Sequence, residues 1–458
     1  MFSGQDPEMS FDNPLFLLVL IGSMAIIRLP KGLAGWGLLS ISALFYSFAG
    51  VYDSALFAAV LIVNWFASVR VQQSRVIFVI AIVVNVGILS FFKYREMFLP
   101  GYVAAEFGRI AIPLGISFYL FHILGYLADL RAGRAATASS QNFSLFVGFF
   151  PHLIAGPIVR ARQLMPQLEP LWRGGRTRLN LMTFGLVLCL SGLIKKVIFS
   201  NSLSPLVDDI FHRSPDNSLV AWAGAWLFGF QIYFDFSGYT DIALGAAMLL
   251  GIRLPNNFRT PYLSTNPKEF WQRWHITLSS WIRDYLYIPL GGNRTGGVVR
   301  QSLVLLFVMT LAGLWHGANW TFVIWGALWA GYILLWRVLT PAMKYVPIPL
   351  RWLLNVVVVM NLWVIFRAPN FDFAVLYLHK MYSFDIPEVP TFSLVVSLLG
   401  CLALMLLHWI ESLTQGIRAM LVVRRLSKPA TVSCIAGLCL LLLLFPNTDI
   451  NPFIYFRF

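Results

Sequence analysis

Long apolar runs separated by short polar stretches extend along almost the whole chain. They lie at about residues 14–28, 33–50, 54–69, 76–92, 110–128, 180–199, 218–234, 302–319, 321–339, 350–366, 391–410 and 430–446. Most approach the about 20 residues that an α-helix needs to cross a bilayer, and none alternates as the strands of a membrane β-barrel do. The pattern predicts an all-α membrane protein with about 11–12 transmembrane helices.

The composition supports this fold class and excludes several others. Of the 458 residues, 58% are hydrophobic and only 12% are charged, whereas a soluble domain carries about 25% charged residues. A soluble enzyme, a disordered protein and a fibrous protein are therefore excluded. No internal repeat or polar appendage divides the pattern, so we expect residues 1–458 to form a single integral membrane domain.

The positive net charge has a membrane explanation. The net charge of +14 is expected of basic loops that face the cytoplasm, and we expect no nucleic acid partner. Acidic residues precede the first apolar run, while Arg28 and Lys31 follow it, which places the N-terminus outside the cell. The first 13 residues lack the basic start of a cleaved signal peptide, so the first run should remain as a helix. The four cysteines show no metal-binding spacing, and we expect no metal ion and no bound cofactor.

Two regions do not have the pattern of simple membrane spans. In residues 142–178 an apolar stretch is interrupted at Pro151 and at Gly156 and Pro157, which predicts a re-entrant segment that is either buried in protein or lines a cavity. Residues 251–300 combine seven basic and two acidic residues with several aromatic ones. That mixture fits an interfacial or re-entrant helix, and a cytoplasmic anchor loop is an equally good interpretation.

Two histidines are candidates for catalysis. His316 ends an apolar run next to the small residues Gly313 and Gly317, which allow the close approach of another helix or of a substrate chain. An ionisable side chain at membrane depth is costly and is therefore a functional candidate, although a hydrogen bond between helices would also explain it. His275 lies among tryptophans in residues 270–281, and a continuous helix there would place it on one face with Trp271. Its alternative role is that of an aromatic-belt residue.

Acidic residues also occur within a long apolar stretch, at residues 231–241. Asp235 and Asp241 flank Ser237 and Gly238 there, which predicts a broken helix around a polar cavity or a cap between two abutting helices. His408 lies near the end of a later run, where we expect it to face lipid headgroups. The chain has no nucleophile elbow, phosphate-binding loop or zinc-protease motif, so common hydrolases and nucleotidases have no support.

At these residues the chain resembles a known family. Residues 270–275 (Phe-Trp-Gln-Arg-Trp-His) and 278–292 (Leu-Ser-Ser-Trp-Ile-Arg-Asp-Tyr-Leu-Tyr-Ile-Pro-Leu-Gly-Gly) resemble the signature of membrane-bound O-acyltransferases (MBOAT), and more narrowly the bacterial alginate O-acetyltransferase branch. Further similar segments are residues 113–119, 150–152, 234–241, 313–318 and 453–458. His122 departs from the pattern, because a glutamine is expected at this position.

The resemblance implies a fold, a reaction and a set of site residues. The expected fold is a ring of helices with re-entrant segments around a central tunnel. His316 would be the catalytic histidine, and His275 would be a second active-site residue that hydrogen-bonds the thioester carbonyl or shapes the tunnel. The residues that we predict to bind the substrate or donor are Tyr233, Asp235, Ser237, Trp274, Arg283 and Trp315.

The predicted reaction moves an acetyl group from a cytoplasmic thioester, with acetyl-CoA as donor, across the bacterial inner membrane. The acceptor would be an exported polysaccharide such as alginate or cellulose. Because related systems complete transfer on a soluble domain, we expect an extracytoplasmic serine-hydrolase-like partner, although the acceptor could instead enter the tunnel directly. The alternatives are D-alanyl or other acyl transfer to teichoic acid or peptidoglycan and, from another class, a transporter.

Overall fold

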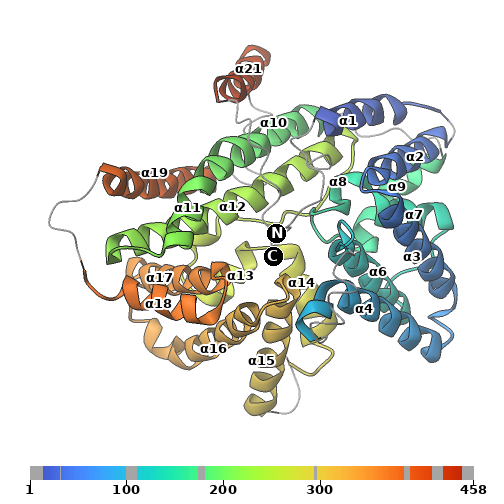
Figure 1. Ribbon diagram of the computed structural model, residues 1–458. Coiled ribbons are helices and arrows are strands. Elements are labelled where there is room, and N and C mark those ends of the chain that lie inside the picture. Colours follow the sequence, from blue (N-terminus) through green and yellow to red (C-terminus); the bar gives the residue numbers. More distant parts are fainter. Residues whose placement is uncertain are drawn as a thin grey trace. The chain divides into compact units, whose positions relative to one another are not determined.

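The computed structural model describes residues 14–30, 32–98, 111–173, 181–292, 297–385, 392–414 and 426–445. Within these ranges the secondary structure is helical and there is no β-strand (Figure 1). The predicted all-α fold class is confirmed. Lys31 and the predicted family segment at residues 453–458 lie outside the described residues.

Eight of the described helical segments are long and apolar enough to cross a membrane. They are Val51–Arg70, Arg75–Phe98, Met182–Arg213, Ser218–Leu249, Gly297–His316, Trp320–Met343, Ile348–Arg367 and Leu394–Leu413. Three shorter apolar helices lie at Leu15–Ile26, Leu33–Ser47 and Lys428–Leu444. This set of helices is typical of a polytopic membrane protein.

The chain divides into two compact units, of which the first, unit 1, comprises Met1–Leu193 and Tyr239–Pro255. Its helices are α1 (Pro14–Ile26), α2 (Leu33–Ser47), α3 (Val51–Arg70), α4 (Arg75–Phe98), α6 (Ile116–Arg131), α7 (Ser140–Gly148), α8 (Phe150–Leu153), α9 (Ala161–Arg173), α10 (Met182–Leu193) and residues 239–249 of α12 (Ser218–Leu249). Within unit 1, α2 packs against α1, α7 and α9 (Figure 1).

The interruption predicted in residues 142–178 is present in unit 1. Helix α7 ends at Gly148, the single turn α8 begins at Phe150, and an irregular stretch precedes α9. Residues 149–159 are buried throughout. Burial in protein is the condition under which an irregular backbone is tolerated in a membrane protein, so this part of the prediction is confirmed.

Unit 2 comprises Ile194–Gly238 and Asn256–Phe458. Its elements are the π-helix η3 (Ile194–Ser200), α11 (Asn201–Arg213), residues 218–238 of α12, the short turn η4 (Pro261–Leu263), α13 (Pro267–Arg273), α14 (Ile276–Ile282), the π-helix η5 (Arg283–Tyr287), α15 (Gly297–His316), α16 (Trp320–Met343), α17 (Ile348–Arg367), α18 (Phe371–Met381), α19 (Phe392–Thr414) and α21 (Lys428–Leu444). Helices α15, α16, α17 and α18 pack in chain order, each against the next (Figure 1).

Small residues bring α15 and α16 into close contact. A Cβ atom added at Gly313 would collide with the carbonyl oxygen of Phe322 and lie 3.0 Å from the Cα of Gly326. Glycine removes the side chain from such a contact, so the two backbones approach closely. The predicted close approach of a helix at Gly313 is therefore confirmed, and it fixes the end of α15 that carries His316.

The prediction of a broken helix at residues 231–241 is wrong. Helix α12 is continuous over 32 residues, from Ser218 to Leu249. The carboxylate of Asp235 does not require a break, because it pairs with Lys196, whose Nζ is 2.5 Å from Oδ1, and accepts a hydrogen bond from Ser200. The single membrane domain and the central tunnel stay predictions.

Candidate active site

His275 lies at a sharp change of direction between α13 and α14. Its backbone has φ 41° and ψ 52°, in the left-handed region, which is uncommon for a residue with a side chain and is associated with functional sites. Two backbone hydrogen bonds flank it: Arg259 N–H donates to Arg273 O at 2.8 Å, and Ile276 N–H donates to Asn257 O at 2.9 Å. The expectation of one continuous helix that carries Trp271 and His275 on a shared face is therefore wrong.

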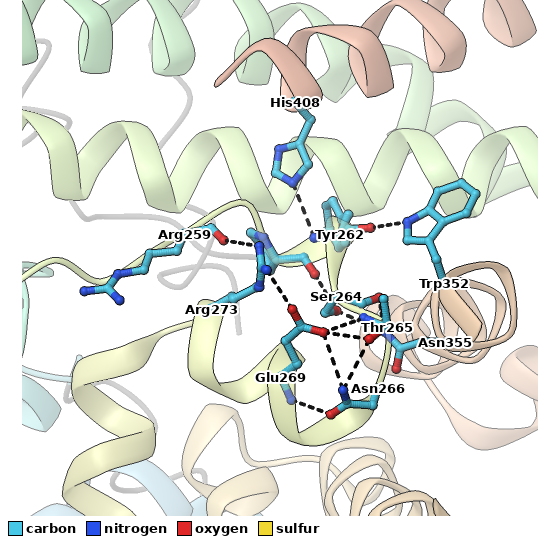
Figure 2. Close-up of polar contacts among 11 residues, drawn as sticks. Arg259, Tyr262, Ser264, Thr265, Asn266, Glu269, Arg273, Trp352, Asn355 and His408 are labelled. Carbon is cyan, nitrogen blue, oxygen red and sulfur yellow. Dashed lines mark hydrogen bonds and ion pairs between the residues drawn. The ribbon is translucent and has the colours of Figure 1, made fainter. Parts of the chain in front are cut away.

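A polar cluster secures the loop before α13, as Figure 2 shows. The carboxylate of Glu269 accepts hydrogen bonds from Thr265 N at 2.8 Å and from Thr265 Oγ1 at 2.9 Å. It also pairs with Arg273 at 2.6 Å. Asn266 Oδ1 accepts the N–H of Glu269 at 2.8 Å and so caps α13. These bonds keep the pKa of Glu269 below its usual range, although burial of the carboxyl opposes them.

Helix α17 holds the same loop from another direction (Figure 2). Trp352 Nε1 donates to Tyr262 O at 2.8 Å. Asn355 Nδ2 donates to Ser264 O at 3.0 Å and to Ser264 Oγ at 2.9 Å. The loop that leads to His275 is therefore attached both to α13 and to a long apolar helix, which gives the histidine a rigid support.

The imidazole of His275 is completely buried. Its Nδ1 lies 3.1 Å from Oδ1 of Asn257, and the ring packs at 4.6 Å against Phe236. Burial lowers the pKa of His275 to about 3, because desolvation disfavours the charged imidazolium. His275 is therefore neutral at physiological pH.

The ring of Trp315 lies close to both candidate histidines. Its ring centroid is 6.2 Å from that of His275 and 4.9 Å from that of His316. His316 is the last residue of α15 and is buried, with Trp325 at 5.1 Å and Phe366 at 5.3 Å. The structure thus brings His275, Trp315 and His316 together in unit 2, within a largely aromatic environment that excludes water.

The other predicted binding residues divide into two groups, of which the first contains Trp274 and Arg283. Trp274 is buried, stacks on Phe270 at 5.9 Å and contacts Trp363 at 4.9 Å. It therefore extends the aromatic wall of the site. The side chain of Arg283 is 61% exposed and pairs with its neighbour Asp284 at 2.8 Å, so it lies on the surface of unit 2.

The second group, Tyr233, Asp235 and Ser237, lies on α12 in unit 2. Tyr233 donates a 2.7 Å hydrogen bond to Oε2 of Glu411, and Asp235 pairs with Lys196. Ser237 is buried. Two of these residues thus belong to a buried charged cluster rather than to the pair of histidines.

Sequence reasoning missed most of this charged cluster. Lys195 pairs with Glu411, and Nδ1 of His408 lies 3.4 Å from Oε2 of the same carboxylate. Nε2 of His408 accepts the N–H of Tyr262 at 3.3 Å. His408 is completely buried, so the expectation that it faces headgroups is wrong. The available signal was the pair of lysines inside the apolar run at residues 180–199, where the structure has a π-helix, a feature frequent at functional sites.

Comparison with known proteins identifies the class. The chain belongs to the MBOAT, membrane-bound O-acyltransferase family, whose family model matches residues 129–377. It is therefore a multi-pass membrane protein and an O-acyltransferase. The matched region includes His275, Trp315 and His316, so the buried histidine pair lies in the part of the chain that defines the family.

Three relatives show which members of the family the chain resembles. It is 41% identical to the probable alginate O-acetylase AlgI of Azotobacter vinelandii over 76% of this chain and 72% of that protein. It is 32% identical to the peptidoglycan O-acetyltransferase of Helicobacter pylori over 81% of this chain and 79% of that protein. It is 29% identical to the teichoic acid D-alanyltransferase of Streptococcus thermophilus over 46% of this chain and 54% of that protein.

Proposed function

We propose that this protein transfers an acetyl group from cytoplasmic acetyl-CoA, across the bacterial inner membrane, for O-acetylation of an exported polysaccharide. The observation that carries the proposal is the buried pair His275 and His316, joined by Trp315 in unit 2. Burial excludes water, which would otherwise hydrolyse the thioester. The relatives named for O-acetylation support acetyl as the group transferred.

His316 acts as the general base. It takes the proton of the attacking hydroxyl while the hydroxyl oxygen bonds to the thioester carbonyl carbon, and the sulfur leaves as the thiolate of CoA. A positioned base contributes about 10²–10⁴-fold to the rate. The end of α15 also carries partial negative charge, which stabilises the imidazolium that forms at His316. In a second route His316 itself carries the acetyl group between two transfers.

The donor enters from the cytoplasm at the basic segment of residues 251–300. Acetyl-CoA is polyanionic, and the exposed Arg283 is one of the basic groups available to it. The predicted donor contacts of Trp274 and Trp315 are apolar, and we assign them to the acyl-thioester end. The charged cluster of Lys195 and Lys196 on η3 and Glu411 on α19 holds Tyr233 and Asp235 of α12. We assign this cluster a supporting role outside the site itself.

The acceptor is alginate or a cell-wall polysaccharide, as the names of the relatives indicate for those proteins. A serine-hydrolase-like partner outside the membrane receives the acetyl group and completes the transfer. D-alanyl transfer is the second candidate, because a teichoic acid D-alanyltransferase matches about half of the chain.

The test uses the full-length protein in liposomes and compares two donors, each supplied in the lumen. The first donor is acetyl-CoA with a radiolabelled acetyl group, and the second is a carrier protein loaded with D-alanine. We expect label to leave acetyl-CoA only with the wild-type protein and not with His316→Ala. Transfer from the D-alanyl carrier alone would overturn the choice of donor. Full acetylation of added polysaccharide without any second protein would overturn the need for a partner.

A further inference from the structure

The hydrogen bonds around Asn257 determine which of its side-chain atoms faces His275. The backbone N–H of Thr277 points to Oδ1 of Asn257 at 3.1 Å, and Thr277 Oγ1 donates to the same atom at 2.8 Å. A backbone N–H can only donate, so the atom that it meets must be the amide oxygen rather than the amide nitrogen. This fixes the orientation of the Asn257 side chain.

The orientation of Asn257 in turn determines the tautomer of His275. Nδ1 of His275 lies 3.1 Å from that same oxygen. An amide oxygen only accepts, so Nδ1 must carry the proton, and in the neutral ring Nε2 then has a lone pair and no proton. Burial keeps the ring neutral, as its lowered pKa indicates.

Nε2 of His275 is therefore a buried acceptor. It has no hydrogen-bond partner among the residues that the structure describes, and its ring neighbours are aromatic: Phe236, Phe258 and Trp315. Leaving a buried acceptor unsatisfied costs free energy, and a protein retains such an atom where a ligand completes it. The left-handed backbone at His275 is a second unfavourable feature at the same residue.

We propose that Asn257 is a positioning residue that fixes His275 as the Nδ1–H tautomer, so that Nε2 accepts a hydrogen bond from a substrate hydroxyl or amide N–H. A thioester carbonyl is itself only an acceptor, so His275 does not hold the donor by that group. The hydrogen-bonding group is either the acceptor hydroxyl or an amide N–H in the pantetheine arm of the donor. This inference rests on the proposed function, since it assigns a role within that same site.

The first experiment observes the tautomer directly. Full-length protein labelled with ¹⁵N-histidine is compared with the labelled His275→Gln variant, so that the difference spectrum belongs to His275. We expect a protonated Nδ1 and an unprotonated Nε2 in the wild type, and a mixture of the two tautomers in Asn257→Ala. A protonated Nε2 in the wild type would overturn the proposal, whatever the enzyme's donor or acceptor.

The second experiment measures the pH dependence of transfer. We expect Asn257→Ala to lower kcat by about tenfold or more, because kcat falls in other enzymes when the group that fixes the tautomer of a catalytic histidine is lost. Asn257→Asp keeps the accepting oxygen and should restore most of the activity. Its carboxylate stabilises the imidazolium of His275, so the neutral ring is lost at a higher pH, and the acid limb of the profile should move upward.

Asn64→Ala is the matched control, because Asn64 on α3 of unit 1 is also a buried asparagine with three hydrogen bonds, to Val60 and Asn85. It should lower the melting temperature and leave the acid limb in place. A His275→Gln variant with a raised KM for acetyl-CoA would identify the pantetheine amide, and one with a lowered kcat would identify the acceptor hydroxyl. If the wild type transfers acetyl but Asn257→Ala behaves as the wild type does, the role of Asn257 is wrong while the proposed function stands.

Discussion

Nζ of Lys196 lies 2.5 Å from Oδ1 of Asp235, and both side chains are almost completely buried. Removing one partner from a buried pair leaves an uncompensated charge, which costs about 3–5 kcal/mol. We therefore expect Asp235→Leu and Lys196→Met each to lower the Tm of the purified protein strongly. The combined Lys196→Met and Asp235→Leu variant removes both charges and should recover most of the loss.

The measurement is thermal unfolding of the wild type, the two single variants and the combined variant in the same detergent, analysed as a double-mutant cycle. The exposed pair of Arg213 and Asp209, at 2.8 Å, is the control, because exposed ion pairs contribute about 0–1 kcal/mol. If the effects of the two single changes at Lys196 and Asp235 simply add, the pair does not provide the charge compensation that we describe.

His316→Ala should leave the protein folded and abolish transfer. The side chain lies at the end of α15 among aromatic rings, and its truncation removes the base. The expected loss is about 10²–10⁴-fold in kcat, the contribution of a positioned base. Labelled acetyl transfer is measured at matched protein level and Tm. Activity close to wild type in a well-folded His316→Ala protein would contradict the central assignment.

The sequence was sufficient for the features that depend on local pattern. The apolar runs gave the all-α class, and the small residues before His316 indicated a close helix contact, which Gly313 makes with α16. The pairing of distant residues was not accessible in this way. Lys196 and Asp235 are 39 residues apart, and nothing in the local pattern shows that one neutralises the other. For that reason a continuous α12 was mistaken for a broken helix.

The surroundings of His275 could not be predicted for a related reason. Asn257 lies 18 residues before it, and the two meet only because the intervening loop returns and forms backbone hydrogen bonds on both sides of His275. The left-handed conformation of His275 opposes local preference, since residues with a side chain seldom adopt it. Tertiary contacts therefore override the helical pattern of residues 270–281, which alone suggested a single helix.

Gly313→Ala should destabilise the contact between α15 and α16. The added methyl group would overlap the carbonyl oxygen of Phe322, which is backbone and cannot rotate away. Overpacking of this kind costs about 1–3 kcal/mol, and a shift of α15 also displaces His316, so kcat should fall together with the Tm. Gly331→Ala in α16 is the control, because a Cβ there meets nothing within 4 Å. Equal effects of the two changes would show that the contact does not matter.

Glu269 should make the stability of the protein depend on pH. Its carboxylate accepts hydrogen bonds from Thr265 and pairs with Arg273, and its pKa in the folded protein is lowered. When the folded pKa lies below the unfolded one, the unfolded state binds the proton more readily. The stabilisation is then fully present above the unfolded pKa, about 4.3 for glutamate, and is lost as the pH falls through the folded pKa.

We therefore expect Glu269→Gln to lower the Tm at pH 7 and to reduce the further loss of Tm that the wild type shows between about pH 5 and pH 3, the range around the unfolded glutamate pKa. Glu169→Gln is the control: Glu169 and Arg173 have the same spacing and the same 2.6 Å separation as Glu269 and Arg273, but both of their side chains are exposed. An exposed pair contributes little, so this control should follow the wild-type curve at every pH. A Glu269→Gln protein whose Tm runs parallel to that of the wild type down to pH 3 would show that the carboxylate is not held as the hydrogen bonds in Figure 2 indicate.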